Sequence, residues 1–241
     1  MLVSFPDPIT ACVFGASGGI GAAFVEQLAA DPAVRTVYAG SRKPIAASAK
    51  IQPFACDLTD EASIASAAAA IGKIDLIIIA TGMLHDEAQQ PEKSFRAQTA
   101  DGYARAFAIN TIGPALIGKH FLPLLSRDRR GVFAALSARV SSVSDNRLGG
   151  WHAYRASKAA LNMVLRNFAV ELGRTHKDAI IAGLHPGTVA TALSEPFQRN
   201  VEPGKLFTPE FSAAQMLAVL DTLTSTDSGN LFAWDGQRID Y

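Results

Sequence analysis

Short apolar runs alternate with longer helix-like segments along most of this chain. The apolar runs have the length and continuous hydrophobic character of strands that are buried on both faces of a parallel sheet. They cover residues 10–14, 34–39, 51–56, 74–80, 132–136, 179–184 and 230–234. The helix-like segments between them cover residues 22–30, 60–70, 99–125, 153–172 and 211–223. This alternation predicts parallel βαβ units in a doubly wound α/β sheet of about seven strands, with helices on both faces.

No repeat or linker interrupts the pattern, so residues 1–241 are predicted to form a single domain. Thr59 is the expected N-cap of the alanine-rich second helix. Gly113 and Pro114 are expected to bend the long third helix. A stretch rich in proline and glycine, near residues 187–208, breaks the alternation. Its composition predicts a mobile loop that covers a substrate.

A glycine-rich turn joins the first strand to the first helix. It reads Gly15-Ala-Ser-Gly-Gly-Ile-Gly21, with the spacing G-x-x-x-G-x-G, and Gly18 adds further backbone freedom. A strand, glycines and a helix in this order allow a pyrophosphate to approach the backbone at a helix N-terminus. A tight turn without any ligand is the alternative for such a motif on its own.

The end of the second strand bears on which dinucleotide would bind. An acid at that point holds the ribose 2′-hydroxyl of NAD, whereas a nearby arginine suits the 2′-phosphate of NADP. The chain has Ser41 and Arg42 there and no acid, and Ser17 in the glycine turn adds a hydroxyl. The pattern therefore favours NADP(H) over NAD(H).

Tyr154 and Lys158 lie four residues apart in a helix-like segment, so their side chains share one helix face. An ammonium beside a phenol favours the phenolate, and Lys158 is therefore expected to lower the pKa of Tyr154 from its usual value near ~10. A tyrosine tuned in this way can exchange a proton near neutral pH. With a hydride donor and a serine hydroxyl from the preceding strand end, the pair would interconvert a carbonyl and an alcohol.

Composition narrows the range of partners. Lys and Arg number 22, as do Asp and Glu, and the resulting net charge of zero predicts binding neither to nucleic acid nor to an anionic membrane. Cys12 and Cys56 lie in strand-like runs and are predicted to be buried, reduced thiols rather than a disulfide or a metal site. The N-terminus lacks the features of a signal peptide, and the most apolar run, residues 74–84, is too short to span a bilayer. These features predict a cytoplasmic protein that binds no metal.

Taken together, the glycine spacing and the Tyr154/Lys158 pair resemble the short-chain dehydrogenase/reductase family, and the resemblance extends over nearly the whole chain. Three further motifs follow in the family's order: Asp57-Leu58, Ile109-Asn-Thr-Ile-Gly113 and Pro186-Gly-Thr-Val-Ala-Thr191. The segments Gly149–Lys158 and Trp234-Asp-Gly236 resemble the C-factor and sniffer-type carbonyl reductase subgroup. The resemblance implies a single Rossmann-type dinucleotide-binding domain.

The resemblance also implies roles for individual residues. Asp57 and Leu58 would contact adenine, and Asn110 would complete a catalytic tetrad and hold a water behind Lys158. Lys158 would also bind the nicotinamide ribose, and Val189 and Thr191 would hold the carboxamide. The implied cofactor-binding residues are Gly15, Ser17, Gly18, Gly19, Ile20, Gly21, Ser41, Arg42, Asp57, Leu58, Ala80, Thr81, Gly82, Asn110, Tyr154, Lys158, Pro186, Gly187, Val189 and Thr191.

The serine of the tetrad has three candidates. The common family spacing, thirteen residues before the tyrosine, selects Ser141, whereas the Gly-Ser pattern of the subgroup selects Ser142. Ser137 at the strand end is the third candidate, and Ala138 stands where many family members continue with another serine. Ser142 is preferred. The predicted catalytic set is Asn110, Ser142, Tyr154 and Lys158.

The predicted function is NADP(H)-dependent hydride transfer between a small-molecule carbonyl and its alcohol, with Tyr154 as general acid/base. The alternative is a nucleotide-binding regulatory or signalling protein that keeps the fold and turns over little. The resemblance further implies a homodimer or homotetramer assembled through two long helices. Trp151 and His152 are expected either to line the substrate pocket or to be exposed, and His85 and His185 are expected to be structural.

Overall fold

A computed structural model describes residues 2–5, 7–43, 45–86 and 90–241. Within this part of the chain, eight strands form one sheet in the order β10-β9-β6-β5-β4-β1-β2-β3. Their bounds are Ile9–Phe14 (β1), Val34–Ser41 (β2), Ile51–Ala55 (β3), Leu76–Ile79 (β4), Gly131–Leu136 (β5), Ala179–His185 (β6), Asn230–Ala233 (β9) and Arg238–Ile239 (β10). Neighbouring strands are parallel except β9 and β10. The predicted doubly wound sheet is confirmed. The additional strand, β10, was not predicted, because it has only two residues and its sequence contains no apolar run.

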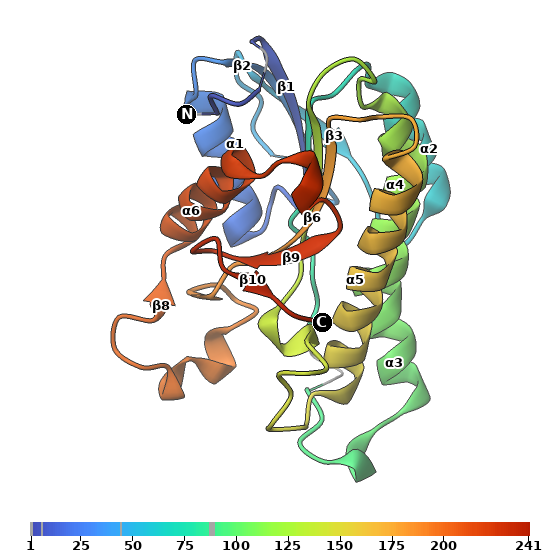
Figure 1. Ribbon diagram of the computed structural model, residues 1–241. Helices are drawn as coiled ribbons and strands as arrows, with labels where there is room; N and C mark the ends of the chain where they lie inside the picture. The colour runs from blue at the N-terminus through green and yellow to red at the C-terminus, as the bar shows by residue number, and fades with distance from the viewer. Residues whose placement is uncertain (1, 6, 44, 87–89) are drawn as a thin grey trace.

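Helices cover both faces of the sheet (Figure 1). One face packs against α1 (Gly19–Ala30) and α6 (Pro209–Thr222), and the other packs against α2 (Glu61–Ala70), α4 (Gly113–Phe121) and α5 (His152–Leu172). Strand β1 is apolar along most of its length because both of its faces are buried. Val13 belongs to the cluster under α1 and α6, whereas Cys12 and Phe14 belong to the cluster on the opposite face.

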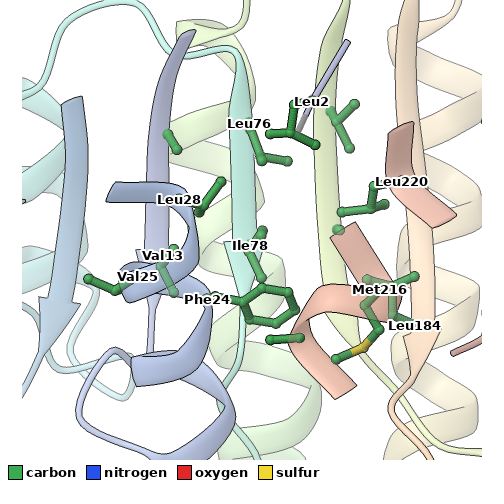
Figure 2. Packing of buried hydrophobic residues seen from close by; sticks show 14 of the residues in the cluster. Leu2, Val13, Phe24, Val25, Leu28, Leu76, Ile78, Leu184, Met216 and Leu220 are labelled. Carbon is green, nitrogen blue, oxygen red and sulfur yellow. The ribbon is translucent and has the colours of Figure 1, made fainter. Parts of the chain in front are cut away.

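The core under α1 and α6 is built from side chains of both helices and of the central strands (Figure 2). Phe24 of α1 and Met216 of α6 meet Val13 and Ile78 of the sheet, and all four are fully buried. Burying such a side chain contributes on the order of 1.5–3 kcal/mol. The carboxyl ends of β1, β4, β5 and β6 are therefore held side by side, and the loops that follow them meet at one edge of the sheet.

The long helix predicted for residues 99–125 is divided into shorter pieces. Helix α3 (Ala100–Phe107) runs into a π-helical turn, Ala108–Ile112, and then into α4. A π-helical turn inserts one extra residue and often marks a functional site. Gly113 is required by packing, because a Cβ there would lie 2.2 Å from Cδ1 of Leu58.

The N-cap predicted for the second helix is wrong by one residue. Asp60 is the cap of α2, and its side chain accepts a hydrogen bond from the Ala62 N–H. The Thr59 hydroxyl instead donates to Asp57 Oδ1 at 2.7 Å. Asp and Thr are both good N-caps, so the spacing alone did not distinguish these neighbours.

The proline- and glycine-rich segment is partly regular. Strand β7 (Thr188–Val189) pairs with β8 (Leu206–Phe207), and a 3-10 turn, Glu195–Asn200, lies between them. Figure 1 shows this segment at the same end of the molecule as the first turn of α5. Cys12 and Cys56 are free and buried, as predicted. Among the described helices, none is both long and apolar enough to cross a membrane.

Candidate active site

Two neighbouring pockets open at the carboxyl ends of the central strands. The first, here called the glycine-side pocket, has a volume of about 220 Å³ and is lined by the glycine turn, the residues after β4 and Lys158. The second, the loop-side pocket, has a volume of about 280 Å³ and is lined by residues 137–140, Trp151 and the segment after β6. Tyr154 lines both. A larger hollow of about 550 Å³ lies between α1 and α6, but none of the predicted site residues lines it.

The glycine turn brings its backbone close to the first pocket. Gly15 has a φ of +81°, which favours glycine, and a Cβ on Gly21 would lie 2.1 Å from the Gly15 carbonyl oxygen. Gly18 is the N-cap of α1 and offers no capping side chain, so the first N–H groups of this helix have no side-chain acceptor. Gly19 faces Thr191, whose Cγ2 would lie 2.9 Å from an added Cβ. Ser17 is exposed beside them.

The residues after β4 complete the wall of the glycine-side pocket. Ala80, Thr81 and Gly82 all line it. The Thr81 hydroxyl is buried and has no hydrogen-bond partner among the described residues, and a buried hydroxyl of this kind calls for one. A free helix N-terminus, close backbone approach and an unsatisfied hydroxyl are features that fit the phosphates and ribose of a dinucleotide.

The predicted 2′-phosphate end of the site lies at the carboxyl end of β2. Ser41 is buried and its hydroxyl donates to the Lys43 carbonyl, whereas Arg42 is exposed. The Asp57 carboxylate accepts from the Thr59 N–H at 2.9 Å, and this bond is the main reason why the pKa of Asp57 lies below its usual value; the charge of Arg42 contributes less. The Arg42 guanidinium is therefore the nearby cation that can meet an added phosphate.

Tyr154 and Lys158 share one face of α5, as predicted. Lys158 is 2% exposed, and its Nζ donates to the Leu136 carbonyl at 2.7 Å. Burial lowers the pKa of Lys158 to about 7. Burial also raises the pKa of Tyr154 to about 12, so the expected lowering by Lys158 is wrong. The reason is that loss of water disfavours the phenolate more than the lysine, itself directed at Leu136, favours it. Tyr154 is accordingly protonated at neutral pH and is equipped to donate.

Asn110 projects from the π-helical turn and is completely buried. Its Nδ2 donates to the Met83 carbonyl at 2.8 Å and to Ser157 Oγ at 3.0 Å, and its Oδ1 accepts from the Met83 N–H at 2.8 Å. The side chain therefore fastens the loop after β4 to α5, next to Lys158. Its predicted role in holding a water stays a prediction.

The preferred serine, Ser142, does not lie with Tyr154. It lines a separate hollow of about 250 Å³ together with Arg139, Arg238 and Asp240. The chain turns through a 3-10 segment, Arg139–Ser141, before reaching it, which directs Ser142 away from the strand end. Of the three candidates, Ser137 is the one that lines both pockets with Tyr154. The choice of Ser142 is therefore wrong in its geometry.

The segment after β6 forms the floor and outer wall of the loop-side pocket. Pro186 and Thr191 line both pockets, and Gly187 has a φ of +77° and packs so closely on Phe207 that a Cβ would lie 2.7 Å away. Val189 is buried, and its carbonyl accepts from the Ser194 hydroxyl. The backbone around Val189 and the Thr191 side chain are thus presented where the two pockets join.

Apolar side chains close the loop-side pocket from outside. The Trp151 ring lies 5.0 Å from that of Phe197, and Leu193 and Val201 complete the wall. Trp151 therefore lines the pocket, whereas His152 does not. His185 lines it too, with its Nδ1 buried and unpaired, and burial lowers its pKa to about 4.

Three further polar residues were not predicted. Glu92 is buried, and its carbonyl accepts from the Trp151 N–H at 2.6 Å at the start of α5. Ser157 and Asn162 are buried on α5 and bond to residues of the neighbouring loops. Asn162 follows Lys158 by four residues, so a polar side chain on the Tyr154 face was a usable signal. Nothing in the polar stretch around Glu92 distinguished it.

Comparison with known proteins agrees with this arrangement. A profile of the family described as short chain dehydrogenase matches residues 9–202. The chain is 32% identical over 237 residues to the 1-hydroxy-2-glutathionyl-2-methyl-3-butene dehydrogenase of Rhodococcus sp., covering 94% of this chain and 97% of that protein. It is 34% identical over 136 residues to the C-signal protein of Myxococcus xanthus, covering 56% of this chain and 76% of that protein.

A solved structure is similar over the entire fold. It is the NADPH-bound carbonyl reductase from chicken fatty liver, with a TM-score of 0.84, 25% identity, and coverage of 99% of this chain and 97% of that one. The chain therefore belongs to the short-chain dehydrogenase family of oxidoreductases, and within it resembles the carbonyl reductase-like subgroup, as its motifs predict.

Proposed function

We propose that this protein is an NADP(H)-dependent oxidoreductase that transfers hydride between the cofactor and the carbonyl carbon of a small molecule. The observation that carries the proposal is the position of Tyr154, which lines both the glycine-side pocket and the loop-side pocket. A cofactor in the first pocket and a substrate in the second would meet at its hydroxyl. The names of two relatives, a dehydrogenase and an NADPH-bound carbonyl reductase, support the same chemistry.

The chain's own residues would bind, orient and protonate. The glycine turn and the free N-terminus of α1 hold the pyrophosphate, Arg42 meets the 2′-phosphate, and Thr81 offers its unpaired hydroxyl. Bound NADPH supplies the hydride. Tyr154, protonated because its pKa is raised, donates a proton to the substrate oxygen. Lys158 follows Tyr154 by four residues on α5 and lines the same pocket. With a pKa of about 7, its amino group is protonated in part of the molecules at neutral pH.

The apolar wall of the loop-side pocket restricts the substrate to a small molecule with an apolar body. Phe197, Leu193 and Val201, all from the segment near residues 187–208, contribute to that wall. The segment therefore acts as the substrate cover that its composition predicts. Its contacts with Trp151 and with His85, whose Nε2 lies 3.0 Å from the Leu193 carbonyl oxygen, hold it over the pocket.

The test is the consumption of NADPH with a panel of neutral ketones, aldehydes and quinones, and the Tyr154→Phe variant is the decisive comparison. The variant removes only the hydroxyl, so kcat should fall by roughly 10²-fold or more while the Kd for NADPH stays nearly unchanged. A Tyr154→Phe protein that reduces its best substrate at the unmutated rate would refute this mechanism. Tight NADPH binding without turnover of any carbonyl would instead support the regulatory alternative.

We also propose that the protein is a homodimer or homotetramer that assembles through the outer faces of α4 and α5. Ile112, at the end of the π-helical turn before α4, and Met163 and Val170 on α5 are exposed by half or more. Exposed apolar side chains on neighbouring helical elements fit an association surface. Light scattering of the purified protein, with Met163→Glu as the disrupting variant, decides between monomer and oligomer.

A further inference from the structure

The hydroxyls of Ser137 and Ser141 form a hydrogen-bond chain through Asn162. Ser137 Oγ donates to Asn162 Oδ1 at 2.7 Å, Asn162 Nδ2 donates to Ser141 Oγ at 2.7 Å, and Ser141 Oγ donates to the Ala138 carbonyl at 2.6 Å. All three side chains are buried. A serine hydroxyl has a single proton to donate. The protons of Ser137 and Ser141 are therefore already committed inside the protein, to Asn162 and to the backbone.

The remaining candidate is committed elsewhere. Ser142 Oγ lies 3.2 Å from Ser144 Oγ and accepts from the Asp145 N–H at 3.2 Å. It lines the hollow beside Arg238 and Asp240, not the pockets that Tyr154 lines. Ser142 is buried, and its hydroxyl belongs to the turn 142–145 that follows the 3-10 segment.

The wall of the loop-side pocket between these serines is Ala138, which carries no donor. The Tyr154 hydroxyl, unlike the serine hydroxyls, makes no hydrogen bond to another described residue, and Tyr154 lines both pockets. The Tyr154 hydroxyl is therefore available to a substrate, whereas the hydroxyls of Ser137, Ser141 and Ser142 are engaged within the protein.

We infer that a substrate oxygen in this site is held by the Tyr154 hydroxyl without help from a serine, and that Ser137, Asn162 and Ser141 are a scaffold that fixes the turn 138–141 against α5. The inference rests on the proposed function. The reaction balances as a two-electron reduction: hydride from NADPH forms the new C–H bond, Tyr154 supplies the O–H proton, and solvent reprotonates the phenolate. NADPH is oxidised to NADP⁺ as the carbonyl becomes an alcohol.

A site with one donor selects its substrates by reactivity. Removing one hydrogen-bond donor from a developing oxyanion lowers kcat by ~10²–10³-fold in enzymes that rely on it. A carbonyl beside an electron-withdrawing group develops a more stable oxyanion and needs less help. The substrate class that follows is electron-poor carbonyls, such as adjacent dicarbonyls and quinones, whereas isolated ketones should be poor substrates.

The first experiment installs the missing donor. The Ala138→Ser variant is compared with the unmutated protein on biacetyl, which has two adjacent carbonyls, and on butanone, which has one. Biacetyl should be the better substrate of the unmutated protein by roughly 10²-fold in kcat/KM. Ala138→Ser should raise kcat for butanone about tenfold or more and for biacetyl by less. Equal kcat/KM for the two substrates in the unmutated protein would overturn the inference.

The second experiment removes each candidate hydroxyl in turn, with kcat, KM and the urea unfolding midpoint of the unliganded protein measured for Ser137→Ala, Ser141→Ala and Ser142→Ala. The first two should lower the midpoint, because each leaves a buried partner unpaired. All three should keep kcat within about threefold. A kcat loss of about 10²-fold with an unchanged midpoint in any one variant would identify that serine as the donor and overturn the inference.

The two proposals fail in different ways. If NADPH binds but neither carbonyl is reduced, the proposed function fails. The urea unfolding midpoints of the unliganded variants still test the structural role of Ser137 and Ser141. That role is contradicted if Ser137→Ala and Ser141→Ala unfold at the same urea concentration as the unmutated protein.

Discussion

At the scale of single residues, burial controls the chemistry of this site more than pairing does. Lys158 and Tyr154 are within one helical turn of each other, yet burial shifts each pKa toward the uncharged form. A phenol with a pKa of about 12 is neutral at pH 7, and a lysine with a pKa of about 7 is charged only about half of the time. A low-dielectric pocket tolerates such a pair better than two full charges. The pair is thus set for proton donation, the direction that carbonyl reduction requires.

The depressed pKa of Lys158 predicts how stability varies with pH. The unfolded lysine keeps its proton to about pH 10.5, whereas the folded one loses it from about pH 7. Between these values the unfolded state binds more protons, so stability should rise with pH. The isosteric variant Lys158→Met lacks this penalty, and its stability relative to the unmutated protein should be highest below pH 7 and should decline toward pH 10. Urea unfolding at several pH values measures the difference, and a difference that does not change with pH would contradict the depressed pKa.

Arg42 predicts the choice of cofactor. It is exposed at the carboxyl end of β2, where no acid stands to hold a ribose 2′-hydroxyl. Arg42→Ala should weaken NADPH binding by about tenfold or more and leave NADH binding nearly unchanged, because only the charge-assisted contact to the 2′-phosphate is lost. The Kd values come from fluorescence titration. Arg174→Ala, an exposed arginine beyond the far end of α5, is the matched control. Equal affinities for NADPH and NADH in the unmutated protein would refute the preference.

At the scale of elements, the turn between β1 and α1 lies close to the segment after β6, and under the proposed function it would also lie close to a dinucleotide. Gly19 begins α1, and the Thr191 side chain lies against it. The glycine turn and the Thr191 segment are more than 170 residues apart in sequence, yet they form one surface. The helix provides its N-terminus, and the later segment provides the opposite wall.

Gly19→Val should therefore abolish NADPH binding while the protein stays folded. The added side chain would meet Thr191 Cγ2 at 2.9 Å and fill the space over the helix N-terminus. Circular dichroism verifies the fold, and titration measures the affinity. Gly72→Val is the control, since nothing lies within 4 Å of a Cβ at that position and it is remote from the site. Normal NADPH binding by Gly19→Val would show that the turn does not hold the cofactor.

At the scale of the whole molecule, the sheet is fastened at the end opposite the site by one buried carboxylate. Asp75 is 2% exposed and accepts from the Thr10 N–H at 2.9 Å and from Arg129 Nε at 2.7 Å. Its own backbone bonds to Thr10 and Val132. The amino ends of β1, β4 and β5 thus meet at a single residue, β1 through the Asp75 side chain and backbone and β5 through the Asp75 carbonyl.

Asp75→Ala should lower the free energy of unfolding by about 3 kcal/mol, the lower end for breaking a buried ion pair because Arg129 reaches solvent. The loss leaves the Thr10 N–H unpaired as well. Urea denaturation measures the change. Glu61→Gln, in the exposed pair with Lys119, is the control and should alter stability little. An Asp75→Ala midpoint equal to that of the unmutated protein would contradict this role.

The sequence alone determined the succession of strands and helices along the chain and the burial of the sheet on both faces. It also determined the glycine turn and the shared helix face of Tyr154 and Lys158. These features follow from local periodicity, from glycine spacing and from the 3.6-residue helical repeat, which are readable without knowing the neighbours. Elements with weak local signals were missed. Strand β10 is two residues long, and the π-helical turn around Asn110 looks like ordinary helix in its sequence.

Only the tertiary structure decided the roles that depend on distant contacts. The three serines differ in which partner each hydroxyl meets, Asn162 or the turn 142–145, and spacing from Tyr154 carries no information on that. The pKa values of Tyr154 and Lys158 depend on how much water the surrounding loops exclude, which is a property of the packed molecule rather than of residues four apart on a helix. Local sequence therefore placed the candidate catalytic side chains, while burial and hydrogen bonding across the fold set the pKa and the hydrogen-bond partners of each.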